Sequence, residues 1–300
     1  MRTRSWLFVP GDSERKLAKV LSAGADVVIV DLEDAVAGSA KDAARALAAE
    51  WLSDAADRAG DARLWARINP LDSSLWRADL EAVLGGGPSG IVVPKAAGPA
   101  QLAQLAAALD ELEPRHGLEQ GSTRILPLVS ETALATLAIG DYARIPETQA
   151  GTGLEKRLLG LTWGAEDLSA AIGASRKRDD QGRWTDLFRM VRATVLLTAH
   201  ARSIAAIDTL HAEFRDLEGL ERVARESYAD GFAGMLAIHP AQVEVINRAF
   251  TPSEQEIADA RAIIAAFEAE PNLGAAQVEG RMIDRPHLEQ ARRLLERSGG

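Results

Sequence analysis

The sequence predicts an α/β fold, a (β/α)8 TIM barrel with a C-terminal helical extension. Short apolar runs rich in β-branched residues recur eight times, and Ala-, Leu-, Glu- and Arg-rich segments with helical spacing lie between them. The runs are nearly continuous rather than alternating, which is typical of a parallel sheet covered by helices. A barrel of eight such units typically needs about 250 residues, and the chain has 300.

The elements follow from these patterns in chain order. The predicted strands are Ser5–Val9, Asp26–Val30, Arg63–Ile68, Gly90–Val93, Arg124–Val129, Leu158–Trp163, Ser203–Ile207 and Met235–Ile238. Helical spacing is clear in the segments Ser13–Ala23, Lys41–Ala56, Ala100–Leu112 and Leu217–Asp230. A doubly wound sheet is the alternative, but it usually carries a glycine-rich turn after its first strand. The turn here, Pro10-Gly11-Asp12-Ser13, has one glycine, so the barrel is favoured.

The chain after residue 250 is longer than a barrel requires. Thr251-Pro252-Ser253-Glu254 predicts a helix start, and the helix should run to about Glu270, before the break at Pro271. A short tail through Gly280 to Pro286 and a final helix follow. We therefore predict a barrel over residues 1–250 and a helical extension over 251–300. The extension is either a peripheral addition with no part in the active site or a lid.

Composition excludes several classes of protein. The chain has no cysteine, which excludes a disulfide framework, a thiolate metal site and a cysteine nucleophile. Its 34 basic and 44 acidic residues give a net charge of −10, which argues against a nucleic-acid partner. No run approaches the roughly 20 apolar residues of a membrane helix. We expect a cytoplasmic protein that binds neither nucleic acid nor membrane.

Ionisable side chains follow nearly every predicted strand. In barrels of this kind the active site lies at the C-terminal ends of the strands. The side chains at these ends are Glu33, Asp34, Arg67, Lys95, Glu131, Glu166, Asp167, Asp208 and His239. A barrel with only a structural role has no reason to collect charge at one rim, so we expect a functional site there.

Glu131 and one acid of the Glu166-Asp167 pair would meet from neighbouring strands. Two carboxylates completed by water and a substrate oxygen suit Mg²⁺, and the scarcity of histidine and absence of cysteine argue against zinc. Pairing of these acids with a rim arginine such as Arg67 is the alternative. Arg67 itself fits either that pairing or a bidentate clamp on a substrate carboxylate.

Two basic features allow more than one interpretation. Lys95 would serve as a Schiff-base nucleophile or, as we favour, pair with a rim carboxylate or orient substrate. The basic residues Arg4, Arg15, Lys16 and Lys19 lie near the first strand and helix, where they form either a solvated face or a phosphate-binding patch. His239, beside Pro240, is better interpreted as a hydrogen-bonded structural residue than as a catalytic one.

Seven motifs then occur in the order expected of one family. They are Arg4–Gly11, Asp31-Leu32-Glu33-Asp34-Ala35-Val36, Arg67-Ile68-Asn69, Val93-Pro94-Lys95, Ser130-Glu131-Thr132, Trp163–Leu168 and Gly280–Pro286. Across essentially the whole chain, the sequence resembles the citrate lyase β-subunit-like (CitE-like) proteins of the HpcH/HpaI aldolase group, which includes malyl-CoA and citramalyl-CoA lyases.

The resemblance implies a Mg²⁺-dependent carbon–carbon lyase that cleaves or forms a 3-hydroxy-acyl-CoA, with acetyl-CoA and a 2-oxo acid as the other partners. By motif, Glu131 and Asp167 correspond to the metal ligands. Arg67 corresponds to the residue that binds the 2-oxo-acid carboxylate and polarises its carbonyl. Asp284 corresponds to an acid/base on a C-terminal segment that closes over a neighbouring subunit's barrel.

The resemblance gives further site residues and an oligomer. Glu33, Asp34 and Lys95 fall in the substrate site. Arg4, Arg15 and Lys16 are candidates for binding the CoA phosphates. A lid shared between subunits requires a homo-oligomer, and the family suggests a trimer or a dimer of trimers.

Three other functions remain open. One is the β subunit of a multi-subunit citrate lyase, which acts on a thioester held by an acyl-carrier partner. Another is a metal-dependent aldolase acting on free hydroxy acids. The last is a non-catalytic binding protein built on a decayed barrel, against which the intact set of Arg67, Glu131, Asp167 and Asp284 argues.

Overall fold

The computed structural model describes residues 3–145, 153–269, 275–278 and 281–298. Eight parallel strands form one sheet in the order β5-β4-β3-β2-β1-β8-β7-β6. Bridges from Ile125 to Leu158 and from Leu128 to Thr162 link the two outer strands, so the sheet closes almost completely and the predicted barrel is confirmed. The strands are β1 (Ser5–Pro10), β2 (Val27–Asp31), β3 (Arg63–Arg67), β4 (Gly90–Val93), β5 (Arg124–Pro127), β6 (Gly160–Thr162), β7 (Ala205–Asp208) and β8 (Gly234–Ala237).

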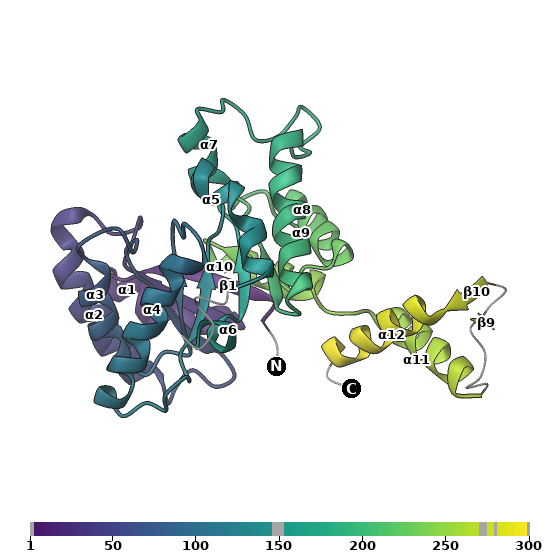
Figure 1. Ribbon diagram of the computed structural model, residues 1–300, viewed down its shortest axis with the longest axis horizontal. Coiled ribbons are helices and arrows are strands. Elements are labelled where there is room, and N and C mark those ends of the chain that lie inside the picture. Colours follow the sequence, from purple (N-terminus) through teal and green to yellow (C-terminus); the bar gives the residue numbers. More distant parts are fainter. Residues whose placement is uncertain (1–2, 146–152, 270–274, 279–280, 299–300) are drawn as a thin grey trace.

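Helices surround this sheet, as Figure 1 shows. They are α1 (Glu14–Val20), α2 (Lys41–Ala55), α3 (Trp76–Leu84), α4 (Pro99–Leu112), α5 (Ala133–Leu137), α6 (Leu154–Arg157), α7 (Ala165–Ile172), α8 (Asp186–Ala201), α9 (Leu217–Asp230) and α10 (Pro240–Ala249). None of the described helices is long and apolar enough to cross a membrane.

The barrel interior explains why the strands are so uniformly apolar. All residues of β2 and β4 are buried, because one face of each strand meets the interior and the other meets helices. Inside, Trp6 and Trp65 pack edge to face with ring centroids 5.0 Å apart. A Cβ at Gly90 would lie 2.5 Å from the Trp65 ring, so only glycine fits beside this large side chain.

The C-terminal arm consists of α11 (Glu254–Ala269), β9 (Ala275–Val278), β10 (Arg281–Asp284) and α12 (Arg285–Ser298). Ser253 starts α11 as predicted, because its hydroxyl accepts from the Glu256 main-chain N–H at 3.2 Å. The antiparallel pair β9–β10 is a feature that sequence reasoning missed. Its first strand, Ala-Ala-Gln-Val, has one β-branched residue and no clear alternation. Figure 1 shows α11 and α12 side by side, standing away from the barrel.

Candidate active site

Arg67 and Asp31 form the centre of the charged cluster at the C-terminal ends of the strands. They end neighbouring strands and are paired in register. Arg67 donates from Nε and Nη2 to the two oxygens of Asp31, at 2.7 Å each. Burial acts to lower the pKa of Arg67, but the neighbouring carboxylates, Asp31 above all and then Glu33 and Glu131, more than offset it, so the pKa is raised. Asp31 also accepts from the main-chain N–H of Glu33 at 2.9 Å, which fixes the turn that carries Glu33.

Glu33 lies between the two cations of the cluster. Its Oε2 is 2.9 Å from Arg67 Nη1, and its Oε1 accepts a hydrogen bond from Lys95 Nζ. Lys95 Nζ also lies 3.3 Å from Asp167 Oδ1 and 3.8 Å from Asp34 Oδ2. Burial acts to lower the pKa of Lys95, but Glu33 above all raises it. Lys95 is therefore held as an ammonium between carboxylates, which supports pairing rather than Schiff-base chemistry.

Glu131 is buried, and Gly164 packs directly on it. A Cβ at Gly164 would lie 2.8 Å from both Cγ and Oε1 of Glu131, so a larger residue there would displace the carboxylate. Glu131 Oε2 accepts from the main-chain N–H of Lys95 at 2.5 Å. Burial first, and the nearby Asp167 second, raise the pKa of Glu131 to about 8.

The side chains of the neighbouring acids Glu166 and Asp167 point toward different partners. Glu166 forms an ion pair with Lys177 and is half exposed. Asp167 faces Lys95 and is close enough to Glu131 to raise its pKa. Of the pair, Asp167 is thus the one that joins Glu131 at the rim.

The donor set of this rim fits a hard cation. Glu131 and Asp167 supply carboxylate oxygens close to each other, where their mutual repulsion calls for a positive charge. Within the described part of the chain, no group of three or more His, Cys, Asp or Glu side chains is arranged to hold a metal ion. The remaining ligands would have to be water or substrate oxygens, which is how Mg²⁺ is often bound in enzymes.

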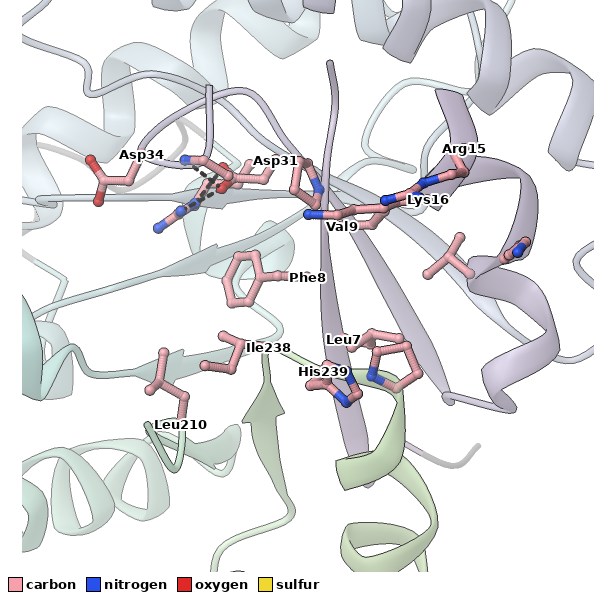
Figure 2. A pocket seen from close by; sticks show the side chains of 16 residues that line it. Leu7, Phe8, Val9, Arg15, Lys16, Asp31, Asp34, Leu210, Ile238 and His239 are labelled. Atoms are coloured by element: carbon pink, nitrogen blue, oxygen red, sulfur yellow. Dashed lines mark hydrogen bonds and ion pairs between the residues drawn. The ribbon is translucent and has the colours of Figure 1, made fainter. Parts of the chain in front are cut away.

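A cavity of about 670 Å³ opens beside the cluster, and Figure 2 shows its lining. Asp31 and Asp34 line it at one side, and Arg15 and Lys16 at another. Arg67, which is hydrogen-bonded to Asp31, also lines it. Its remaining lining is mainly apolar with one further lysine and a histidine: Leu7, Phe8, Val9, Pro10, Lys19, Val20, Ala35, Leu210, Ile238, His239 and Pro240. An elongated ligand with an apolar body and anionic groups would suit this cavity.

The position of Arg4 in the structure separates it from Arg15 and Lys16, with which the sequence analysis grouped it. It precedes β1 and therefore lies at the N-terminal end of the strands, opposite the rim. Its Nε and Nη2 donate to Asp26 at 2.8 Å each, and its Nη1 donates to Thr251. Arg4 does not line the cavity with Arg15 and Lys16, because a strand of six residues separates the two ends.

Asp284, the predicted acid/base, lies on the C-terminal arm. Its side chain is about half exposed, and its Oδ1 lies 2.5 Å from His287 Nδ1. Because β10 stands away from the barrel in Figure 1, the structure does not bring Asp284 to the rim of its own chain.

Several cavity and cluster residues were missed by sequence reasoning. Asp31 belongs to a motif used in the resemblance, but only Glu33 and Asp34 were singled out, although Asp31 is the residue that ends the strand. Phe8 and Ile238 line the cavity and were interpreted only as strand residues. His239 lines it too, and as expected it has a structural contact: its Nδ1 accepts from the Ala241 N–H at 3.1 Å, at the start of α10.

Comparisons with known proteins identify relatives of this chain. A family model described as HpcH/HpaI aldolase/citrate lyase matches residues 4–240. A "citrate lyase subunit beta-like protein" of Mycobacterium tuberculosis is 37% identical over 294 residues, covering 98% of this chain and 95% of the relative. A mitochondrial citramalyl-CoA lyase of Rattus norvegicus is 35% identical over 298 residues, covering 97% and 85%.

A solved structure extends the likeness to three dimensions. The crystal structure of CitE from Mycobacterium tuberculosis in complex with magnesium, acetoacetate and coenzyme A has a TM-score of 0.76 at 35% identity. The match covers 100% of this chain and 99% of that one. The family model, the relatives and this structure all agree with the resemblance carried by the motifs, and the chain belongs to the HpcH/HpaI aldolase/citrate lyase family.

Proposed function

We propose that this protein is a Mg²⁺-dependent carbon–carbon lyase. It cleaves or forms a 3-hydroxy-acyl-CoA such as malyl-CoA or citramalyl-CoA, with acetyl-CoA and a 2-oxo acid as the other partners. The observation that carries the proposal is the meeting of Glu131 and Asp167 near Arg67, which itself lines a cavity that also carries basic residues. The magnesium and coenzyme A bound by the CitE protein of M. tuberculosis support it.

Glu131 and Asp167 would hold the cation. When bound, Mg²⁺ supplies Lewis-acid stabilisation to the hydroxyl and carboxylate oxygens of the substrate. The Glu131 carboxylate is buried and shielded from water. The Asp167 side chain is about 29% exposed and has more room to move. Because Gly164 has no Cβ, the segment that carries Asp167 can pack directly on Glu131.

Arg67 would bind the carboxylate of the 2-oxo acid and stabilise negative charge on its carbonyl oxygen. Asp31 takes two of its donors, Nε and Nη2, and so fixes the plane of the guanidinium before substrate arrives. Nη1, 2.9 Å from Glu33 Oε2, is the donor that lies outside this pair. Glu33, Asp34 and Lys95 would shape the rest of the substrate site.

The cavity would take the CoA part of the substrate. Arg15, Lys16 and also Lys19 supply positive charge for phosphates. The apolar lining, which includes Phe8 and Ile238, suits the pantetheine chain. Arg4 has no part in this proposal because it lies at the other end of β1.

Asp284 would exchange a proton with the methyl carbon of acetyl-CoA. Since the arm stands away from its own barrel, Asp284 would serve the site of a neighbouring subunit in a homo-oligomer, a trimer or a dimer of trimers. His287, in contact with Asp284, would orient the carboxylate. The cytoplasmic location remains a prediction from the sequence.

The test is a direct assay. Purified protein is incubated with Mg²⁺, acetyl-CoA or propionyl-CoA, and glyoxylate, pyruvate or oxaloacetate, and product thioesters are followed by mass spectrometry. Asp167→Ala should abolish Mg²⁺ stimulation and turnover, whereas the matched control Glu166→Ala should retain both. A fully active Asp167→Ala protein that needs no metal would contradict the metal assignment.

The β subunit of a citrate lyase is the second candidate, favoured by the 37% identity to a protein named citrate lyase subunit beta-like. It predicts turnover of a thioester on an acyl-carrier protein and little turnover of free CoA thioesters. Copurification with two further subunits from the native source would favour it. Activity of the isolated chain on a CoA thioester would favour the first proposal.

A further inference from the structure

Asp208 is a strand-end carboxylate that does not take part in the rim cluster. It is 1% exposed, and its two oxygens accept hydrogen bonds from four groups. Oδ1 accepts from Trp163 Nε1 at 2.7 Å and from the Thr209 N–H at 2.8 Å. Oδ2 accepts from Ser227 Oγ at 2.6 Å and from Arg192 Nε at 2.9 Å. Asp208 is therefore occupied by the protein and has no oxygen left for substrate or cation.

Arg192, the cation paired with Asp208, is itself held by two further contacts. Arg192 Nη1 pairs with Asp230 Oδ2 at 2.6 Å, and its guanidinium lies 4.5 Å from the centroid of the Phe232 ring. Hydrogen bonds to an ionised carboxylate are roughly twice as strong as neutral ones. The bond from the Trp163 indole thus ends on a rigid, charged acceptor.

The other side of the Trp163 indole is fixed by aromatic packing. Trp163 is fully buried, and its ring meets Trp184 edge on, with centroids 5.2 Å apart and planes at 60°. Arg178 lies 3.6 Å from the centroid of the Trp184 ring and covers it. With a hydrogen bond on one side and an aromatic cluster on the other, the indole has one position.

Trp163 is joined directly to the segment that carries the proposed cation ligands. The next residue, Gly164, packs on Glu131 with no room for a Cβ, and its N–H donates to Ser130 Oγ at 3.3 Å. Asp167 follows in the first turn of α7. Because the chain is in contact with Glu131 at Gly164 and presents Asp167 three residues later, a shift of the main chain at Trp163 changes the gap between the two carboxylates.

We infer that Asp208 is a positioning residue for the cation site: through its hydrogen bond to Trp163, it sets the separation of Glu131 and Asp167 without touching either. The inference rests on the proposed function. Residues behind the ligands of a metal site typically change metal affinity by about 10- to 100-fold when they are replaced. Asp208 and Trp163 would therefore control cation affinity rather than the chemistry itself.

The test uses Trp163→Phe, which keeps an aromatic side chain but removes the N–H donor together with the five-membered ring of the indole. Binding of Mg²⁺ to the full chain is measured by titration calorimetry without substrate, and thermal unfolding is followed in parallel. We expect the Kd for Mg²⁺ to rise about tenfold or more. CoA affinity, measured the same way, should stay at the wild-type value because the cavity lining is not involved.

The matched control is Trp51→Phe. Trp51 lies in α2, away from the rim, and is also buried. Its Nε1 donates to the main-chain oxygen of Leu17 at 3.0 Å. This change also removes a buried indole N–H bond, here to an uncharged oxygen, so it should lower the Tm and leave the Kd for Mg²⁺ unchanged. An equal rise of the Kd in both variants, or no rise in Trp163→Phe, would overturn the inference.

A second variant covers the case in which Trp163→Phe does not fold. Asp208→Asn removes the charge and replaces one of the two accepting oxygens by an N–H donor that faces other donors, so we again expect the Kd to rise; an unchanged Kd overturns the inference. If the wild-type protein binds no Mg²⁺, the proposed function fails and the inference fails with it. If the wild type binds and the variants bind equally well, only the inference fails.

Discussion

Arg67 Nε and Nη2 each lie 2.7 Å from an oxygen of Asp31, so two neighbouring strands end in one bidentate ion pair. Two parallel bonds fix the guanidinium plane as well as its position. A lysine at this place would provide charge without the fork that matches a carboxylate. In the proposed function, this pair would hold Arg67 in a fixed orientation before substrate arrives.

Arg67→Lys should therefore lose turnover while the protein remains folded. We expect kcat/KM for the 2-oxo acid to fall by about 10²- to 10³-fold, the range seen when a donor to a developing oxyanion is removed. Steady-state kinetics with varied 2-oxo acid measure this, and circular dichroism checks the fold. A wild-type kcat/KM would show that Arg67 serves only to neutralise Asp31.

The raised pKa of Glu131 predicts how stability depends on pH in the metal-free protein. Burial, and then Asp167, raise this pKa from 4.5 to about 8, so between these values the folded state holds a proton that the unfolded state releases. The contribution of Glu131 is therefore fully present below pH 4.5 and is lost as pH rises through 8. In EDTA, the Tm of wild type relative to Glu131→Gln should fall across this window.

The same pKa predicts a pH-dependent affinity for Mg²⁺. Binding needs the ionised carboxylate, so below the Glu131 pKa of about 8 the cation must displace a proton. We expect the Kd to improve by up to about tenfold per pH unit as the pH approaches 8 from below, with about one proton released per ion. Calorimetry in buffers of different ionisation enthalpy counts that proton. A Kd that does not change with pH would contradict the raised pKa.

Mixed oligomers test whether Asp284 serves the active site of a neighbouring subunit. Asp284→Asn alone should lower kcat by about 10²- to 10⁴-fold, the usual contribution of general acid–base catalysis. Asp167→Ala alone should be inactive as well. Co-expression of the two chains should restore part of the activity, because some sites then combine an intact barrel with an intact arm from a neighbour. No recovery in verified mixed oligomers would place each arm at its own barrel.

Lys95 should not act as a nucleophile. Its ammonium is held by Glu33 and lies 3.3 Å from Asp167, and its pKa is raised, whereas a Schiff-base lysine needs a lowered pKa. We expect no covalent adduct after incubation with a 2-oxo acid and borohydride, as judged by the intact mass. Lys95→Arg, which keeps the positive charge but forms no Schiff base, should retain most of the activity. A trapped adduct at Lys95 would reverse this assignment.

Much of the fold could be predicted because it depends on local patterns. Each strand of the barrel is a short apolar run, and Gly90–Val93 and Leu217–Asp230 have in the structure the bounds that the sequence indicates. The hairpin of the C-terminal arm was missed because β9 has no such pattern. Its strands are stabilised mainly by pairing with each other, and sequence periodicity does not report that contact.

The sequence by itself determined which residues gather at one rim. Parallel strands all point the same way, so residues that follow them in the chain, among them Arg67, Glu131 and Asp167, must meet at the same end of the barrel. The reverse holds for Arg4, which precedes its strand and lies at the opposite end. Its position in the chain, before β1, is enough to place it there and to separate it from Arg15 and Lys16, which follow the strand.

Only the tertiary structure decided what each of these side chains touches. Asp31 and Asp208 both end strands, yet Asp31 holds Arg67 at the rim and Asp208 holds Trp163 behind it. Glu166 and Asp167 are adjacent in the chain, yet only Asp167 faces Lys95. The physical reason is that the direction and partners of a side chain depend on packing between elements distant in sequence, which local propensity does not encode.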